Sequence, residues 1–303
     1  MRIVFAGSPE YSVPALISLH EKFGISAVIT QPDRFVGRKK ILTPCPVKAA
    51  TQKLGLPVLD YEKISLHAEE VKKLNADIMI TCAYGQILSK EVLSAFPKGV
   101  WNLHASLLPK YRGASPIQSA ILAGEKFTGV TVMKTELSLD SGDILLVKRC
   151  EIGDRTCGEL KDTLSLLSAE AAVEAVSLLE RGDVQLLMQD EANVTFCKKI
   201  NKEMAKIDFT KSSEEVVRLI KAMSPEPAAY CLLNGVTLNI FDAKTTPLEG
   251  NAGEVLFSDK RGVCVACGNG AVIFDELQLA GGKRMKSADF ANGRKIVTGD
   301  KLD

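Results

Sequence analysis

Residues 101–118 read WNLHASLLPKYRGASPIQ, and within them an apolar run passes into a loop of proline, glycine and polar side chains. Asn102 and His104 are separated by one residue, so on an extended strand both side chains project from the same face. If the apolar run is a buried strand, an amide and an imidazole reach its C-terminal edge together. That edge is where ligands bind in open α/β sheets, so this stretch predicts a fold class and a place for a site.

Strand and helix patterns alternate along the first part of the chain, which indicates an α/β protein with a doubly wound parallel sheet. Strands are expected at 2–7, 25–30, 76–84, 100–104, 129–135 and 143–150. Helices are expected at 13–23, with Ser12 as the cap, at 86–96, at 115–123, and from the Thr156/Glu159 capping box to Gly182. The turn after the first strand lacks GxGxxG, which counts against a dinucleotide-binding enzyme.

The pattern changes after about residue 184, where a polar, mixed stretch begins. A helix then starts at the capping box of Ser212 and Glu215, and short strands separated by turn signals follow it. Such spacing is typical of a small β-barrel of the OB type. We therefore expect a Rossmann-like catalytic domain at 1–184, a linker at 185–205 and an OB-like domain at 206–303.

Composition excludes several classes of protein. The 303 residues include 38 Lys and Arg and 37 Asp and Glu, which gives a net charge of +1. The protein therefore has no overall charge that would attract an acidic partner. No apolar run approaches the roughly 20 residues that span a bilayer, and the first residues, MRIVFAGSPE, lack a signal-peptide pattern. Eight scattered cysteines suit reduced thiols. These features predict a cytoplasmic protein that does not bind membranes, and we expect a monomer.

Two local stretches are nevertheless basic. The long loop expected at 31–48 contains Arg34, Arg38, Lys39 and Lys40 against Asp33. It is either a solvated loop or a mobile arm that binds phosphates. The tail from 281 to 295 concentrates Lys283, Arg284, Lys286, Arg294 and Lys295. A metal is not expected, because the CxxC of Cys264 and Cys267 lies in a predicted strand, where its thiols face opposite ways.

The polar residues of the opening stretch suggest a chemistry. The imidazole of His104 can accept a proton from an attacking amine, and the amide of Asn102 can donate to an oxyanion that develops on a carbonyl. A carboxylate after a second strand, Asp140 or Asp143, could fix the tautomer of the imidazole. Together these groups predict acyl transfer to an amine without a protein nucleophile, since GxSxG is absent.

The motif at 101–116, NxH followed by SLLPxYRGxxP, resembles the signature of formyltransferases that use 10-formyltetrahydrofolate. The LDSGD at 139–143 resembles the LDxGD segment of that family. The resemblance implies a catalytic site of Asn102, His104 and Asp140. It also implies that the segment Ser106, Leu107, Leu108 and Pro109 lines the pocket for the folate cosubstrate.

Within the family, the chain most resembles members that formylate initiator methionyl-tRNA. RIVFAGSPEYS, the QPDR loop, AYGQIL and KIDFTKSSEEVVRLIKAMSPEP carry this likeness along the chain. It implies that Arg34, Arg38, Lys39 and Lys40 approach the acceptor end of the tRNA. It further implies that the C-terminal barrel contacts the tRNA backbone, for which Lys283, Arg284 and Lys286 are the candidates.

Other functions compete with this one. A formyltransferase acting on a sugar amine or a nucleotide amine would share the three catalytic residues but should lack the basic loop and this type of C-terminal barrel. A 10-formyltetrahydrofolate hydrolase would use the same residues with water as the acceptor. From another class, an inactive tRNA-binding module would bind tRNA without any dependence on folate.

Overall fold

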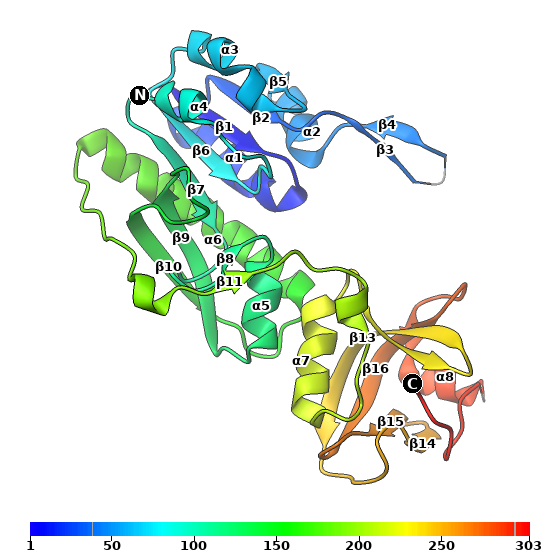
Figure 1. The fold of residues 1–303 in the computed structure, drawn as a ribbon. Coiled ribbons are helices and arrows are strands. Elements are labelled where there is room, and N and C mark those ends of the chain that lie inside the picture. The colour runs from blue at the N-terminus through cyan, green and yellow to red at the C-terminus, as the bar shows by residue number, and fades with distance from the viewer. Residues whose placement is uncertain (38, 294) are drawn as a thin grey trace. The chain divides into compact units, whose positions relative to one another are not determined.

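The computed structural model describes residues 1–37, 39–293 and 295–303, which form two compact units (Figure 1). The first unit comprises Met1–Pro116, Thr128–Glu151 and Lys161–Cys197, and the second comprises Ile117–Phe127, Ile152–Leu160 and Lys198–Asp303. Each unit is assembled from separate stretches of the chain, so the single boundaries at 184 and 205 stay predictions. Among the described residues, no helix is both long and apolar enough to cross a bilayer.

The first unit is built on a seven-stranded sheet of order β10-β9-β7-β6-β1-β2-β5. Its strands are β1 (Ile3–Gly7), β2 (Ala27–Thr30), β5 (Val58–Asp60), β6 (Ile78–Cys82), β7 (Val100–His104), β9 (Phe127–Lys134) and β10 (Ile144–Glu151). The pairs from β5 through β2, β1 and β6 to β7 are parallel, whereas β9 runs antiparallel to β7. The mostly parallel, Rossmann-like sheet confirms the predicted fold class, with β9 added antiparallel to β7.

Helices cover both faces of this sheet (Figure 1), which explains why its central strands β1 and β6 are buried at every position. The helices of the chain's first part are α1 (Val13–Phe23), α2 (Pro46–Lys53), α3 (Ala68–Lys73), α4 (Lys90–Ser94), α5 (Pro116–Leu122) and α6 (Cys157–Arg181). Alternate strand residues such as Val4, Ile29 and Met79 form a core with Val71 of α3 and Val92 of α4. The neighbouring strand residues point to the opposite face, as the period of two requires.

Some of the predicted helix caps and boundaries agree with the structure, and others do not. Thr156 and Glu159 form the predicted capping box, with Glu159 Oε2 accepting from the Thr156 N–H at 2.8 Å. Ser12 precedes α1 but does not cap it, because its hydroxyl donates to the Cys82 carbonyl at 2.6 Å. The helix expected at 86–96 is confined to α4, which begins after the N-cap Ser89.

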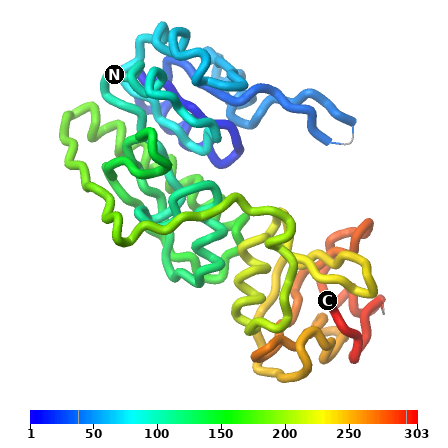
Figure 2. The backbone as a smooth tube through the Cα atoms, in the orientation of Figure 1, coloured from blue at the N-terminus to red at the C-terminus, as the bar shows by residue number. Residues whose placement is uncertain are grey.

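The segment predicted as a long loop at 31–48 is instead a two-stranded hairpin followed by α2. Strand β3 (Arg34–Val36) pairs antiparallel with β4 (Ile41–Thr43), and every residue of both strands is exposed. The hairpin projects from the first unit in Figure 2. Lys48 anchors its base, since its ammonium donates to Asp33 at 2.7 Å and to Asp60 at 2.6 Å.

The second unit is an antiparallel barrel. Its sheet runs β12-β13-β16-β15-β14, with β17 added beside β16. The elements are α7 (Ser213–Met223), β12 (Ala229–Leu233), β13 (Val236–Thr246), β14 (Val255–Asp259), β15 (Gly262–Ala266), β16 (Ala271–Leu279), β17 (Met285–Lys286) and α8 (Ser287–Asn292). The last residues of the chain join the two edge strands. The backbone of Asp303 bonds to that of Leu232 in β12, and the Leu302 N–H donates to the carbonyl of Gly253, which lies just before β14. This closure agrees with the OB-like barrel predicted from the sequence.

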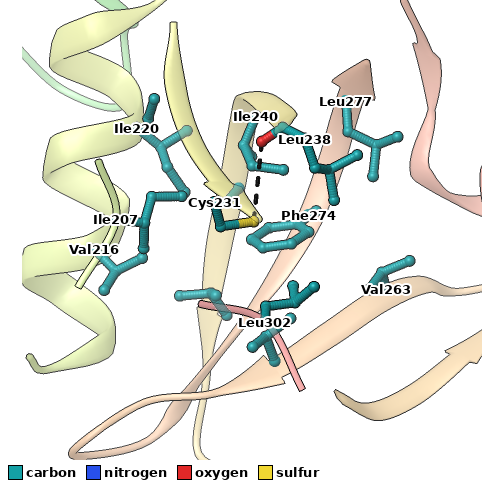
Figure 3. Packing of buried hydrophobic residues seen from close by; sticks show 14 of the residues in the cluster. Ile207, Val216, Ile220, Cys231, Leu238, Ile240, Val263, Phe274, Leu277 and Leu302 are labelled. Atoms are coloured by element: carbon teal, nitrogen blue, oxygen red, sulfur yellow. Dashed lines mark hydrogen bonds between the residues drawn. The ribbon is translucent and has the colours of Figure 1, made fainter. Parts of the chain in front are cut away.

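Two features of sequence shape the barrel. Asn234 and Gly235 both adopt positive φ, and this two-residue turn joins β12 to β13 in the register that pairs Leu233 with Val236. Phe274 is fully buried at the centre of the core, where Figure 3 shows its ring beside Cys231 and Leu238. The Cys231 thiol donates to the Leu238 carbonyl at 3.9 Å, and burial raises the pKa of this thiol to about 12, so it stays a neutral core residue.

The core position of Phe274 generates a prediction. Phe274→Ala removes a fully buried ring, so the barrel should lose about 3–5 kcal/mol of unfolding free energy. Urea unfolding followed by far-UV circular dichroism measures the loss. Val236→Ala, at a half-exposed position of β13, is the matched control and should change little. A loss below about 1 kcal/mol for Phe274→Ala would show that the core repacks around the gap.

The anchor at Lys48 predicts a pH dependence. The hydrogen bonds that Lys48 donates to Asp33 and Asp60 raise the pKa of Lys48 in the folded protein. A raised pKa means that the stabilisation is fully present below the pKa of unfolded lysine and is lost as pH rises through the folded value. The melting temperature of the wild type should therefore be higher than that of Lys48→Met at pH 7. The difference between the two melting temperatures should shrink at strongly alkaline pH. A difference that is constant with pH would contradict the assignment.

Candidate active site

The two polar residues of the opening stretch lie on β7, inside the first sheet. His104 is the last residue of that strand, and Asn102 lies two positions before it. Both therefore leave one face of the sheet where β6 and β7 end in parallel. The His104 side chain is 6% exposed, so protein groups rather than bulk water decide its orientation.

Asn102 is oriented by the neighbouring strand. Thr81 of β6 lies directly opposite Asn102, and its hydroxyl donates to Asn102 Oδ1 at 2.8 Å. In this orientation the amide oxygen of Asn102 is occupied by Thr81. The NH₂ group is consequently the part of Asn102 that can donate to a substrate oxygen.

The imidazole of His104 lies between a carbonyl and a carboxylate. Its Nε2 is 2.9 Å from the Tyr111 carbonyl, and its Nδ1 is 3.6 Å from Asp140 Oδ2. Because a carbonyl only accepts, Nε2 must carry a hydrogen, and Nδ1 is the nitrogen that can gain or lose a proton. The tautomer is thus set by a backbone carbonyl rather than by a carboxylate. Asp140 faces the other ring nitrogen, Nδ1.

The backbone of Asp140 is in the left-handed region. Its φ is +48°, a region that aspartate tolerates better than most residues. Its carboxylate is largely covered and accepts from the Gly113 N–H at 2.8 Å. The Asp140 side chain is therefore fixed from the loop that follows His104 as well as from its own loop. Asp143, the other carboxylate considered above, follows in that loop, where its carbonyl accepts from the Lys134 N–H at 2.9 Å.

The glycines of both motifs are explained by close backbone approaches. A Cβ on Gly113 would lie 2.4 Å from the Cys197 carbonyl oxygen, and one on Gly142 would lie 1.8 Å from that of Lys134. No side chain fits at either distance, so the chain can pass there only as glycine. The glycine of YRG and the glycine of LDSGD are therefore each required by a neighbouring backbone carbonyl.

The predicted folate segment forms a tight turn after β7. The Ser106 hydroxyl donates to the Lys110 carbonyl at 2.7 Å, and Thr131 donates to the Ser106 carbonyl at 2.7 Å. Ser106 and Leu108 are buried, whereas Leu107 and Pro109 are partly exposed. The side chains of Ser106 and Leu108 shape the turn, which leaves Leu107, Pro109 and the backbone to meet a ligand.

The basic residues predicted to contact tRNA in the first unit lie on the β3–β4 hairpin. Arg34 is in β3 and donates to the Gln31 side chain, while Lys39 and Lys40 are exposed in the turn. Arg38 lies outside the described residues. The hairpin also exposes apolar side chains, among them Phe35 at 70%. A projecting element with cations and an aromatic ring suits contact with nucleic acid.

The basic residues of the second unit differ in their availability. Lys283 and Lys286 are exposed. Arg284 is also exposed, but its guanidinium lies 4.1 Å from the ring centroid of Phe241 and 2.5 Å from Glu276 Oε2. Its charge is therefore partly compensated within the barrel. Arg294, which belongs to the same predicted patch, lies outside the described residues.

Several residues that support the site were not predicted. Tyr111, Gln189 and Thr195 contact the loops that carry His104 and Asp140. Two of them belong to 185–205, which the sequence suggested was a linker. Strand β11 (Phe196–Cys197) of this stretch pairs in parallel with β8 (Arg112–Gly113). The stretch has neither hydrophobic periodicity nor a motif, so the sequence gave no signal for this role.

The part of the chain that the structure describes contains no cluster of three or more His, Cys, Asp or Glu side chains that could hold a metal ion. The groups that contact His104 are the Tyr111 carbonyl and the Asp140 carboxylate, and the amide of Asn102 lies two residues before it on the same face of β7. Such a set suits proton transfer and stabilisation of an oxyanion.

Comparison with known proteins identifies the family. A family model described as formyl transferase matches residues 1–176, and one described as formyl transferase, C-terminal domain, matches residues 199–295. The chain belongs to the formyl transferase family. It is 41% identical to a methionyl-tRNA formyltransferase of Bacillus velezensis, over 99% of this chain and 97% of that protein. It is 42% identical to one of Neisseria gonorrhoeae, over 100% of both.

Solved structures share the fold at lower identity. An N-formyltransferase of Helicobacter canadensis, in complex with folinic acid and dTDP-3-aminofucose, is 19% identical with a TM-score of 0.71, over 90% of this chain and 98% of that one. HypX of Aquifex aeolicus, in complex with tetrahydrofolic acid, is 20% identical with a TM-score of 0.65. That match covers 96% of this chain and 46% of HypX, so the chain spans about half the length of HypX.

Proposed function

We infer that the chain transfers the formyl group of 10-formyltetrahydrofolate to the α-amino group of initiator methionyl-tRNA, in the cytoplasm. The observation that carries this inference is the 41–42% identity to methionyl-tRNA formyltransferases over essentially the whole chain. The convergence of Asn102, His104 and Asp140 on one edge of the sheet supports it, because acyl transfer to an amine needs a proton acceptor and an oxyanion donor.

We propose a role for each of the three residues. The methionyl amine forms a bond to the formyl carbon, and His104 Nδ1 accepts its proton, since Nε2 already donates to Tyr111. The imidazolium that results faces the Asp140 carboxylate. The NH₂ of Asn102 donates to the oxyanion. The bond from the formyl carbon to N10 then breaks, and N10 takes up a proton, which gives tetrahydrofolate and formyl-methionyl-tRNA.

We assign the two substrates to different parts of the first unit. The turn at Ser106, Leu107, Leu108 and Pro109 follows directly after His104, which suits the folate whose formyl carbon must lie beside the imidazole. The cations of the β3–β4 hairpin suit the phosphates of the tRNA acceptor end. In the barrel, Lys283 and Lys286 are better placed than the compensated Arg284 to contact further phosphates.

The other functions considered are not favoured. The likeness to a sugar N-formyltransferase is a likeness of fold at 19% identity, and it does not determine the acceptor. The relatives with 41–42% identity over their whole length are methionyl-tRNA enzymes.

The experiment that tests the function is transfer of labelled formyl from 10-formyltetrahydrofolate to charged initiator methionyl-tRNA. Uncharged tRNA, an elongator methionyl-tRNA and water alone serve as controls. Label should appear on the initiator species only. Folate turnover without label on tRNA would instead indicate a hydrolase or a transferase that acts on a small amine. Binding of tRNA without any folate turnover would indicate a tRNA-binding module.

The catalytic assignment predicts graded losses of turnover. His104→Ala should lower kcat by about 100- to 10,000-fold, because it removes the proton acceptor. Asn102→Ala should lower kcat by about 100- to 1,000-fold, because it removes one oxyanion donor. His67→Ala, at a partly exposed histidine stacked on Tyr61, is the matched control and should keep turnover. Wild-type kcat in both site variants would refute the assignment.

The hairpin assignment predicts a change in tRNA binding alone. Reversing the charge of Lys39 and Lys40 to Glu should raise KM for methionyl-tRNA and flatten its salt dependence, because fewer phosphates are neutralised. KM for the folate should not change. Lys53→Glu reverses a charge at an exposed position of α2, away from the hairpin strands, and is the control. An unchanged salt dependence in the hairpin variant would mean that the hairpin is a solvated surface element.

A further inference from the structure

The side chain of Gln189 connects the two loops of the active site. Its Nε2 lies 2.8 Å from the Asp140 carbonyl and 2.8 Å from the Gly142 carbonyl. Its Oε1 accepts from Arg112 Nε at 3.0 Å. One side chain therefore uses both amide hydrogens and its oxygen on groups that flank the catalytic pair.

The chemistry of these partners fixes the orientation of the amide. A flipped Gln189 would direct its oxygen at two carbonyls and its NH₂ at the Arg112 guanidinium, so every contact would become repulsive. Arg112 is 4% exposed and is itself held by Glu191, whose Oε1 lies 2.7 Å from Nη2. The donor and acceptor ends of Gln189 are thus set by a buried cation on one side and by the Asp140 loop on the other.

The loop that Gln189 holds needs support. Asp140 has a φ of +48°, which a residue with a side chain keeps only when its surroundings enforce it. The Gly113 N–H fixes the Asp140 carboxylate, whereas Gln189 fixes the backbone carbonyls of Asp140 and Gly142. Tyr111 and Arg112 lie in the loop at the far end of the same network, and the Tyr111 carbonyl sets the His104 tautomer. Gln189 therefore couples the support of the carboxylate to that of the imidazole.

We propose that Gln189 is a positioning residue for formyl transfer, which holds Asp140 opposite His104 Nδ1 by tying its loop to Arg112. This inference rests on the proposed catalytic roles of His104 and Asp140. Gln189 does not touch the reacting atoms, so its loss should act through Asp140. It should lower kcat and leave the binding of methionyl-tRNA and folate almost unchanged.

The test is Gln189→Met, which keeps the length of the side chain and removes both donors and the acceptor. We expect kcat to fall about 10- to 100-fold, the usual scale for a misplacement near 1 Å, with both KM values within about twofold. Gln185→Met, on an exposed position of the same segment, is the matched control and should keep wild-type kcat. Wild-type kcat in Gln189→Met would overturn the proposal.

A double-mutant cycle separates positioning from a general structural effect. Asp140→Asn keeps an acceptor for the Gly113 N–H but removes the charge that faces His104. If Gln189 acts through Asp140, adding Gln189→Met to Asp140→Asn should lower kcat by no more than about twofold. An undiminished second loss would mean that Gln189 only stabilises the fold and would overturn the proposal.

Two further outcomes are informative. If Asp140→Asn alone keeps wild-type kcat, the proposed catalytic site is wrong, and so is the role of Gln189. If Asp140→Asn is inactive but Gln189→Met is fully active, only the positioning role of Gln189 is overturned.

If Gln189→Met does not fold, Gln189→Glu replaces it, because a carboxylate keeps the contact with Arg112 but cannot donate to the two carbonyls. Wild-type kcat in Gln189→Glu would equally overturn the proposal.

Discussion

The hydrogen bond from His104 Nε2 to the Tyr111 carbonyl is the constraint on which the proposed catalytic site depends. It occupies one ring nitrogen with a neutral acceptor and leaves the other facing the Asp140 carboxylate. At 3.6 Å this second contact is longer than an ordinary hydrogen bond. Its effect is therefore electrostatic, and it is strongest when the ring is protonated. In the proposed mechanism, Nδ1 is therefore the nitrogen that takes up the proton of the attacking amine.

The rest of the first unit keeps those two acceptors in place. The parallel strands β6 and β7 bring Asn102 and His104 to the edge of the sheet, and β8 and β11 pair so that Gly113 packs against the Cys197 carbonyl. Gln189 then spans from Arg112 to the Asp140 loop. The site is thus held by backbone pairing together with the side chains of Gln189 and Arg112, which span its two loops.

The sequence allowed part of this site to be predicted, for clear physical reasons. The common face of Asn102 and His104 follows from the period of a strand, and the edge of the sheet follows from the α/β alternation. The residues alone left Asp140 and Asp143 as alternatives, because that choice depends on a positive φ at Asp140. Gln189 could not be found, because a polar residue in an aperiodic stretch gains its role only from contacts distant in sequence. The hairpin was predicted as a loop, since its short exposed strands lack the alternation that burial imposes.

The way the second unit is assembled has a consequence for how such proteins can exchange parts. Helix α5 and residues 152–160 belong to the barrel unit although they lie within the first two-thirds of the chain. Leu122 of α5 packs on the barrel core, the Lys221 ammonium donates to the Asp154 carbonyl at 2.7 Å, and the Gly158 N–H donates to the Ser224 carbonyl at 3.0 Å. A single recombination breakpoint near residue 200 would give a hybrid whose barrel met foreign partners at all three contacts. Barrel and catalytic unit are therefore expected to be inherited together, with compensating changes on both sides of any such junction.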